Sequence, residues 1–118
     1  MPRSIEVSHG IRLVSVTRFP LLRRFRPELW SKVVVEIDRS AAALAAEQKG
    51  SVSSRETTTV GGLRARRYDI VYERGGKQLT ERVGFVLREK TEYELLCRFE
   101  RGQSSSACDE LFETFRLR

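Results

Sequence analysis

Histidine is almost absent from this chain, with His9 as its single residue, and cysteine occurs only twice, at Cys97 and Cys108. One histidine and two cysteines without C-x-x-C spacing cannot complete a plausible zinc shell, so we expect neither a metal nor a cofactor. No apolar run approaches the roughly 18 residues that a membrane-spanning helix needs. The first ten residues also lack the apolar core of a signal peptide. The sequence therefore predicts no transmembrane span and a cytoplasmic location by default.

Catalytic signatures are missing as well. There is no G-x-S-x-G nucleophile elbow, and the glycine pairs at 61–62 and 75–76 lack the flanking residues of a P-loop or a dinucleotide-binding turn. Neighbouring carboxylates at 92 and 94, and at 109–110, fit solvent-facing strand positions and a helix cap. We therefore expect a protein that is not an enzyme.

What the chain does contain is arginine, distributed unevenly. The 118 residues fit one domain, 1–118, and their net charge is +6. Residues 1–30 carry six Arg against two Glu, and residues 63–91 carry eight basic against four acidic residues, whereas residues 92–118 carry six acidic and four basic. Clustered arginine attracts nucleic acid or an acidic partner. The alternative is a solvated strand face, because most of these charges alternate with apolar residues.

The first half of the chain gives mixed patterns. Residues 11–16 and 32–37 are rich in β-branched side chains and predict two strands, the second with Val33, Val35 and Ile37 on one face. The segment between them has two prolines and bulky apolar side chains, which indicates an irregular loop held to the core by Trp30.

An alanine-rich helix should follow. Asp38 or Ser40 can cap its beginning, and Gly50 can end it in the left-handed conformation. Because alanines allow close approach, we expect this helix to cross over flat on one face of a sheet. Residues 51–62 then predict an extended strand that runs into a Gly-Gly turn.

The second half predicts an antiparallel meander followed by a helix. Three runs within residues 63–99 alternate apolar and polar positions, and glycines 75–76 can form the hairpin turn between the first two. From Ser106 the period changes to that of a helix, with Ser106 and Asp109 arranged as a capping box. Its apolar face carries Cys108, Leu111, Phe112 and Phe115. The predicted fold class is α+β, an antiparallel sheet with a crossover helix and a C-terminal helix.

The two cysteines face the same interlayer space in this prediction. Cys97 shares a strand face with Leu95, and Cys108 shares a helix face with Leu111. A disulfide between them would contribute roughly 3 kcal/mol in the chain-entropy description. Two buried free thiols remain the alternative. A disulfide would change the expected location to an exported or cell-envelope protein, because such bonds persist in oxidising compartments.

Arginines interleaved with apolar residues at 21–30 form the strongest candidate for a binding site. We expect partner contacts at Arg23, Arg24, Arg26, Phe25 and Trp30, since arginine supplies charge and the aromatic rings supply stacking. The alternative is a loop whose apolar residues fill the edge of the core while the arginines remain in water. Tyr68 and Arg82 are further candidates that either line a pocket or fill a sheet face.

The order of these elements resembles the PsbP-like fold. The matching stretches are "PELW" at 27–30, "TTTVGGLRARRYDIVY" at 57–72, "LTERVGFVLREKTEYELLC" at 79–97 and the closing "CDELFETFRLR". This family includes the photosystem PsbP subunits, Ran-binding Mog proteins, and bacterial DcrB-type and actinobacterial lipoprotein-like domains. The resemblance implies an α/β/α sandwich that acts without catalysis, as a protein-binding, assembly or chaperone-like module. No binding residue can be carried over, because the shared motifs are turns and core positions. The alternative function is a basic domain that binds nucleic acid or an anionic surface.

Overall fold

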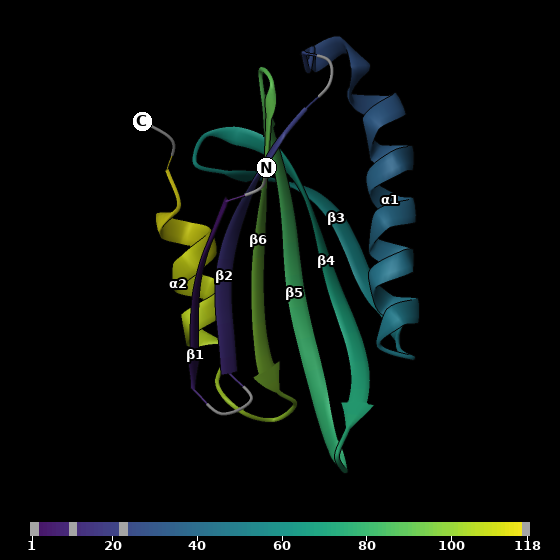
Figure 1. Cartoon of the computed structure of the whole chain (residues 1–118), viewed down its shortest axis with the longest axis vertical. Helices are drawn as coiled ribbons and strands as arrows, with labels where there is room; N and C mark the ends of the chain where they lie inside the picture. The colour runs from purple at the N-terminus through teal and green to yellow at the C-terminus, as the bar shows by residue number, and fades with distance from the viewer. Residues whose placement is uncertain (1–2, 10–11, 22–23, 117–118) are drawn as a thin grey trace.

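A six-stranded antiparallel sheet with two helices forms the body of the protein (Figure 1). The computed structural model describes residues 3–9, 12–21 and 24–116. The elements are β1 (Arg3–His9), β2 (Arg12–Pro20), the 3-10 turn η1 (Pro27–Leu29), α1 (Trp30–Glu47), β3 (Ser51–Val60), β4 (Leu63–Arg74), β5 (Lys77–Arg88), β6 (Thr91–Glu100) and α2 (Ser106–Thr114). The strand order is β1-β2-β6-β5-β4-β3, so α1 connects two strands that lie far apart in the sheet. The α+β class and the crossover helix are confirmed.

The strand predicted at 32–37 is wrong, because these residues lie inside α1. Three successive valines favour a strand locally. Every fourth residue from Val33 through Ile37 to Ala41 and Ala45 nevertheless faces the sheet, which is the helical period. Val35, which the strand prediction placed on one face with Val33 and Ile37, is 50% exposed. Burial of one long helical stripe therefore outweighs local β-propensity. Trp30 packs on the core as expected, and it is the first residue of this helix.

The predicted ends of the helix are also wrong. Asp38 and Ser40 lie in its interior, where the Ser40 hydroxyl donates to the Glu36 carbonyl at 3.2 Å. The left-handed residue after the helix is Lys49, with φ 57°, and not Gly50. Gly50 is needed for a different reason: a Cβ there would lie 2.2 Å from the Val71 carbonyl oxygen.

The predicted meander is confirmed as β4, β5 and β6. Gly75 and Gly76 turn between β4 and β5 with φ values of 59° and 78°, which glycine adopts without strain. The expected strand β3 is also present and ends in the Gly61–Gly62 turn. In the resulting register, Tyr68 of β4 pairs with Val83 of β5.

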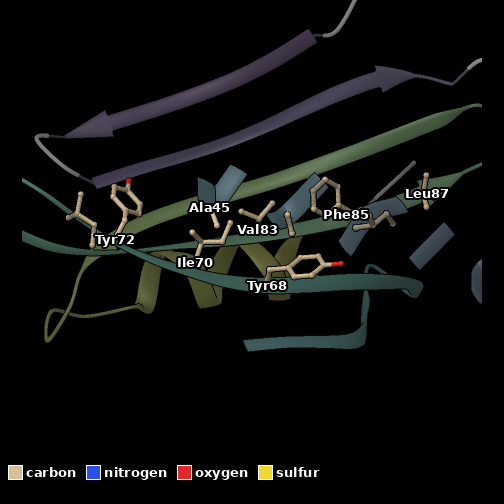
Figure 2. Packing of buried hydrophobic residues seen from close by; sticks show 10 residues of the cluster. Ala45, Tyr68, Ile70, Tyr72, Val83, Phe85 and Leu87 are labelled. Atoms are coloured by element: carbon tan, nitrogen blue, oxygen red, sulfur yellow. The ribbon is translucent and has the colours of Figure 1, made fainter. Parts of the chain in front are cut away.

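Helix α1 packs on one face of the sheet over β3, β4 and β5. Figure 2 shows Ala45 close to Ile70 and Val83, with the ring of Phe85 farther along the same face. The small side chains of Ala41 and Ala45 let the helix approach the sheet closely, as expected. The buried residues of this cluster are Ile37, Ala41, Ala45, Tyr68, Ile70, Tyr72, Leu79, Val83, Phe85 and Leu87.

Helix α2 packs on the opposite face, against β6 and β2. Its Phe112 lies on Gly84 of β5, where a Cβ would come within 2.5 Å of the ring. Cys108 of α2 is joined to Cys97 of β6 by the expected disulfide, with the Cα atoms 5.4 Å apart. The predicted capping box is wrong: Ser105 occupies the N-cap position without a side-chain cap, and its hydroxyl bonds to Asp109 at 3.1 Å.

Candidate functional site

One end of the sheet collects positive charge from five separate segments. At this end β1 begins, β2 stops, β3 turns into β4, β5 turns into β6, and the chain leaves α2 (upper end in Figure 1). We call this the cationic end, and its described basic residues are Arg3, Arg18, Arg24, Arg26, Arg64, Arg88, Lys90 and Arg116. Such clustering creates a local positive potential beyond that of the chain's average charge.

The segment that follows β2 is fixed at this end by the β5–β6 turn. The backbone N–H of Leu21 donates to the Lys90 carbonyl at 2.8 Å, and that of Phe25 donates to the Glu89 carbonyl at 2.6 Å. Pro27 then begins η1, where its locked φ suits the first position and its missing N–H costs nothing. These contacts place the side chains of residues 24–30 against the turn at 88–90.

Trp30 is the centre of an aromatic and cationic stack. Its ring meets the ring of Phe25 edge to face, with centroids 6.3 Å apart. The Arg64 guanidinium, which comes from the start of β4, lies 5.5 Å from the centroid of the Trp30 ring. This cation–π contact stabilises the approach of the β3–β4 turn to the beginning of α1.

These elements enclose a hollow of about 520 Å³, which we call the arginine pocket. It is lined by Arg24, Phe25, Arg26, Pro27, Glu28, Trp30, Gly62, Leu63, Arg64, Leu87, Arg88 and Glu89. Four arginines face two glutamates in this lining, and the remaining side chains are mainly apolar. Arg24 and Glu89 form an ion pair at 3.4 Å, with about two-thirds of each side chain exposed.

The arrangement suits recognition of an anion that also has an apolar part. Guanidinium groups bind carboxylates in a bidentate manner, and an apolar wall beside them accepts a side chain. No described residue of the lining is a histidine, cysteine, serine or threonine, so the pocket offers no recognisable nucleophile with an adjacent base. Within the described ranges, no three His, Cys, Asp or Glu side chains gather in a way that could hold a metal ion.

The candidates at 21–30 come together in this pocket. Arg24, Phe25, Arg26 and Trp30 all line it. Arg23 lies outside the described residues. The alternative was a loop whose apolar residues fill the edge of the core. It is confirmed in part, because Phe25 and Trp30 also pack against the core cluster beneath α1.

Tyr68 lies away from the pocket, buried beneath α1 with 1% of its surface exposed. Its hydroxyl donates to Asp38, which also receives the Arg66 Nε–H at 3.1 Å. Burial raises the pKa of Asp38, but the hydrogen bonds and the charge of Arg66 outweigh this and lower it below its usual value. Burial and the bond to Asp38 raise the pKa of Tyr68. This group fastens α1 to β4.

Arg82 lies on the opposite face of the sheet from Tyr68 and is 9% exposed. Its Nε–H donates to Asp69 of β4 at 3.0 Å, and its NH1 group donates to Asp109 of α2 at 2.9 Å. The guanidinium also lies 5.7 Å from the centroid of the Phe99 ring. Arg82 therefore links α2 to the sheet, and it shares no pocket with Tyr68.

Sequence reasoning missed Arg64, Leu63, Arg88, Leu87 and Glu89, which complete the pocket. They come from the two hairpin turns at the same end of the sheet. Their one signal is positional: Leu63 and Arg64 follow the predicted Gly-Gly turn, and Leu87, Arg88 and Glu89 lie between the second and third predicted strand runs. These turns lie beside the segment that follows β2 only because of the order of the strands in the sheet. An alternating pattern along the sequence does not predict that order.

A smaller hollow of about 290 Å³ adjoins the arginine pocket along the side of α1. Glu92 of β6 lines it, and Glu94 lies two residues further on the same strand face. Burial raises the pKa of Glu92. For Glu94, burial comes first, and the charges of Glu92 and Glu81 raise its pKa further. Two half-buried glutamates therefore lie next to each other on this face, beside the hollow.

No protein-family model and no curated protein matches this chain. Among solved structures, the chain is similar to PA94 of Pseudomonas aeruginosa, a protein of unknown function that its description provisionally calls a regulator. The two share 16% identity with a TM-score of 0.62, over 100% of this chain and 83% of that one. At this identity the likeness shows a shared fold alone. No helix of the described chain is long and apolar enough to span a bilayer.

Proposed function

We propose that this chain is a non-enzymatic protein-binding module, of an assembly or chaperone-like kind, that docks an acidic segment of its partner in the arginine pocket. One observation carries the proposal: four arginines surround an apolar hollow at whose wall Trp30 and Phe25 lie. A partner side chain can bury apolar surface there while its flanking carboxylates meet guanidinium groups. Arginine and aromatic residues together are the types that dominate binding energy at protein interfaces.

The arginines of the pocket are available for such contacts. Arg26 and Arg88 make no ion pair with any described residue. Arg24 has only the exposed pair with Glu89, and pairs of that kind contribute about 0–1 kcal/mol, so a partner carboxylate can replace Glu89 with little loss. Arg64 is held by its stack on Trp30, which leaves its outer N–H groups to donate.

The PsbP-like resemblance is part of this proposal. Its members act largely through protein partners, which is the role proposed here for this chain. The resemblance supports a binding role without naming a partner. The cytoplasmic or cell-envelope location stays a prediction, although a disulfide is typical of oxidising compartments.

Nucleic-acid binding is a second candidate, favoured by the width of the cationic end. Eight described basic residues at one end can follow a phosphate backbone. Against it, the Trp30 ring already carries Arg64 and Phe25, which limits its use as a platform for a base. This candidate predicts affinity for DNA or RNA that falls steeply with added salt.

Capture from a native lysate, followed by mass spectrometry, tests the proposal. The immobilised wild type is compared with the double variant Arg24→Gln/Arg26→Gln. Arg39→Gln/Arg101→Gln serves as the control, because it removes the same charge at exposed positions away from the pocket. We expect proteins that the wild type and the control retain to be lost by the pocket variant, with nuclease treatment having no effect. Equal retention by all three proteins would rule out the pocket as the docking site.

A further inference from the structure

A second hollow at the cationic end is lined by three cations and no acidic residue. It measures about 430 Å³ and is lined by Arg3, Arg18, Pro20, Lys90 and Thr91. The residues come from the start of β1, the end of β2 and the β5–β6 turn. We call it the Arg3–Arg18 hollow. It is separate from the arginine pocket, with which it shares no residue.

The two hollows open on different faces of the sheet. Arg18 is two residues from Val16, which packs with the α2 cluster, so its side chain lies on the α2 face. Leu87 and Trp30 of the arginine pocket belong to the α1 cluster on the other face. The β5–β6 turn passes between them, with Arg88 lining the arginine pocket and Lys90 lining the Arg3–Arg18 hollow.

Arg3 and Arg18 are directly opposite each other in the β1–β2 register. Like charges at such cross-strand positions repel and destabilise the pair of strands. Neither arginine, nor Lys90, forms an ion pair with any other described residue. None of the three charges therefore has a paired carboxylate within the part of the chain that the structure describes, and an anion in the hollow would reduce the repulsion.

We propose that the Arg3–Arg18 hollow binds a phosphate group carrying two or more negative charges, as in a phosphate monoester or a diphosphate. Two guanidinium groups present pairs of N–H donors that match phosphate oxygens, and the ammonium of Lys90 adds a third charge. The Thr91 hydroxyl is a further donor at the wall. A single carboxylate would neutralise one of the three charges, whereas a phosphate monoester or diphosphate neutralises most of them.

Calorimetric titration of the full chain with inorganic pyrophosphate tests this site. Arg18→Gln removes one charge-assisted contact and should weaken binding about tenfold or more. Arg101→Gln removes the same charge at an exposed position outside the hollow, and Arg26→Gln does so in the arginine pocket. Arg101→Gln should bind pyrophosphate as the wild type does, and Arg26→Gln shows whether the anion binds in the arginine pocket instead.

A second readout separates binding from a structural role of Arg18. At one fixed concentration, pyrophosphate should raise the thermal midpoint of the wild type and of Arg101→Gln, and raise that of Arg18→Gln by clearly less. In low salt without the anion, Arg18→Gln should be at least as stable as the wild type, because the repulsion with Arg3 is gone.

Vesicles of phosphatidylcholine, with and without phosphatidic acid, identify the source of the phosphate group. Arg18-dependent binding of pyrophosphate alone indicates a soluble phosphate compound, and additional binding of phosphatidic acid vesicles indicates a lipid headgroup. The proposal is overturned if neither probe binds, or if Arg18→Gln binds as tightly as Arg101→Gln. Loss of binding in Arg26→Gln alone would overturn it too, and would assign the phosphate to the arginine pocket.

Discussion

The contact between Gly84 and Phe112 gives the sharpest prediction about how α2 is held on the sheet. An alanine Cβ at position 84 would lie 2.5 Å from Cε2 and 3.0 Å from Cζ of the Phe112 ring, which is 8% exposed. The ring must therefore move, and overpacking of this kind costs about 1–3 kcal/mol. Alanine also favours a strand over glycine by roughly 0.5–1 kcal/mol. We expect Gly84→Ala to lower the free energy of unfolding by about 1–2 kcal/mol.

Chemical denaturation of a double-mutant cycle measures this directly. In the background of Phe112→Ala the obstructing ring is absent, so the same Gly84→Ala change should become neutral or stabilise the protein by about 0.5 kcal/mol. The sign change between the two backgrounds is the signature of the contact. An equal cost in both backgrounds, or no cost in the wild type, would refute the packing that the structure shows between α2 and β5.

Two further predictions concern stability. Replacing Cys97 and Cys108 by serine opens a loop with a sequence separation of 11. The change should lower the free energy of unfolding, measured by urea denaturation, by about 3 kcal/mol. An unchanged denaturation midpoint would contradict the presence of the disulfide. Glu92 and Glu94 have pKa values raised mainly by burial, so their stabilising contribution is complete below the ordinary value of 4.5 and is lost as the pH rises through the higher folded value. The double change to glutamine should therefore increase the thermal midpoint at neutral pH and not at pH values below that range; an equal effect at both would show that charge is not the cause.

The sequence pattern predicted the parts of the fold that repeat a single period. In β4, β5 and β6 every second residue over part of the strand is apolar, as at Tyr68, Ile70 and Tyr72, and glycines occupy the turn between the first two strands. The disulfide followed from the same logic, because a strand face and a helix face each placed one cysteine in the layer between them.

Helix α1 was harder to predict, because two signals overlap in it. The run from Val33 to Val35 has the composition of a strand, and the following alanines have that of a helix. The segment is helical because a helix buries Val33, Ile37, Ala41 and Ala45 against β3, β4 and β5. This burial requires the complete sheet. Local propensity does not contain that information.

Half of the arginine pocket could be predicted and half could not. Arg24, Phe25, Arg26 and Trp30 are close in sequence, so their composition indicated a site. Arg64 and Arg88 reach the same place only through the strand order and the register across β4 and β5. The cross-strand meeting of Arg3 and Arg18 likewise depends on the register of β1 and β2.

Fluorescence titration of Trp30 tests the central claim most directly, because Trp30 is the single tryptophan of the chain and lines the arginine pocket. The probe is a synthetic peptide of aspartates and glutamates around one leucine, and the control peptide carries asparagine and glutamine instead. We expect a saturable change in Trp30 emission with the acidic peptide alone, weakened by Arg26→Gln and by Arg88→Gln but not by Arg101→Gln. An emission that stays constant, or that changes equally in all of these variants, would contradict binding of an acidic segment in the arginine pocket.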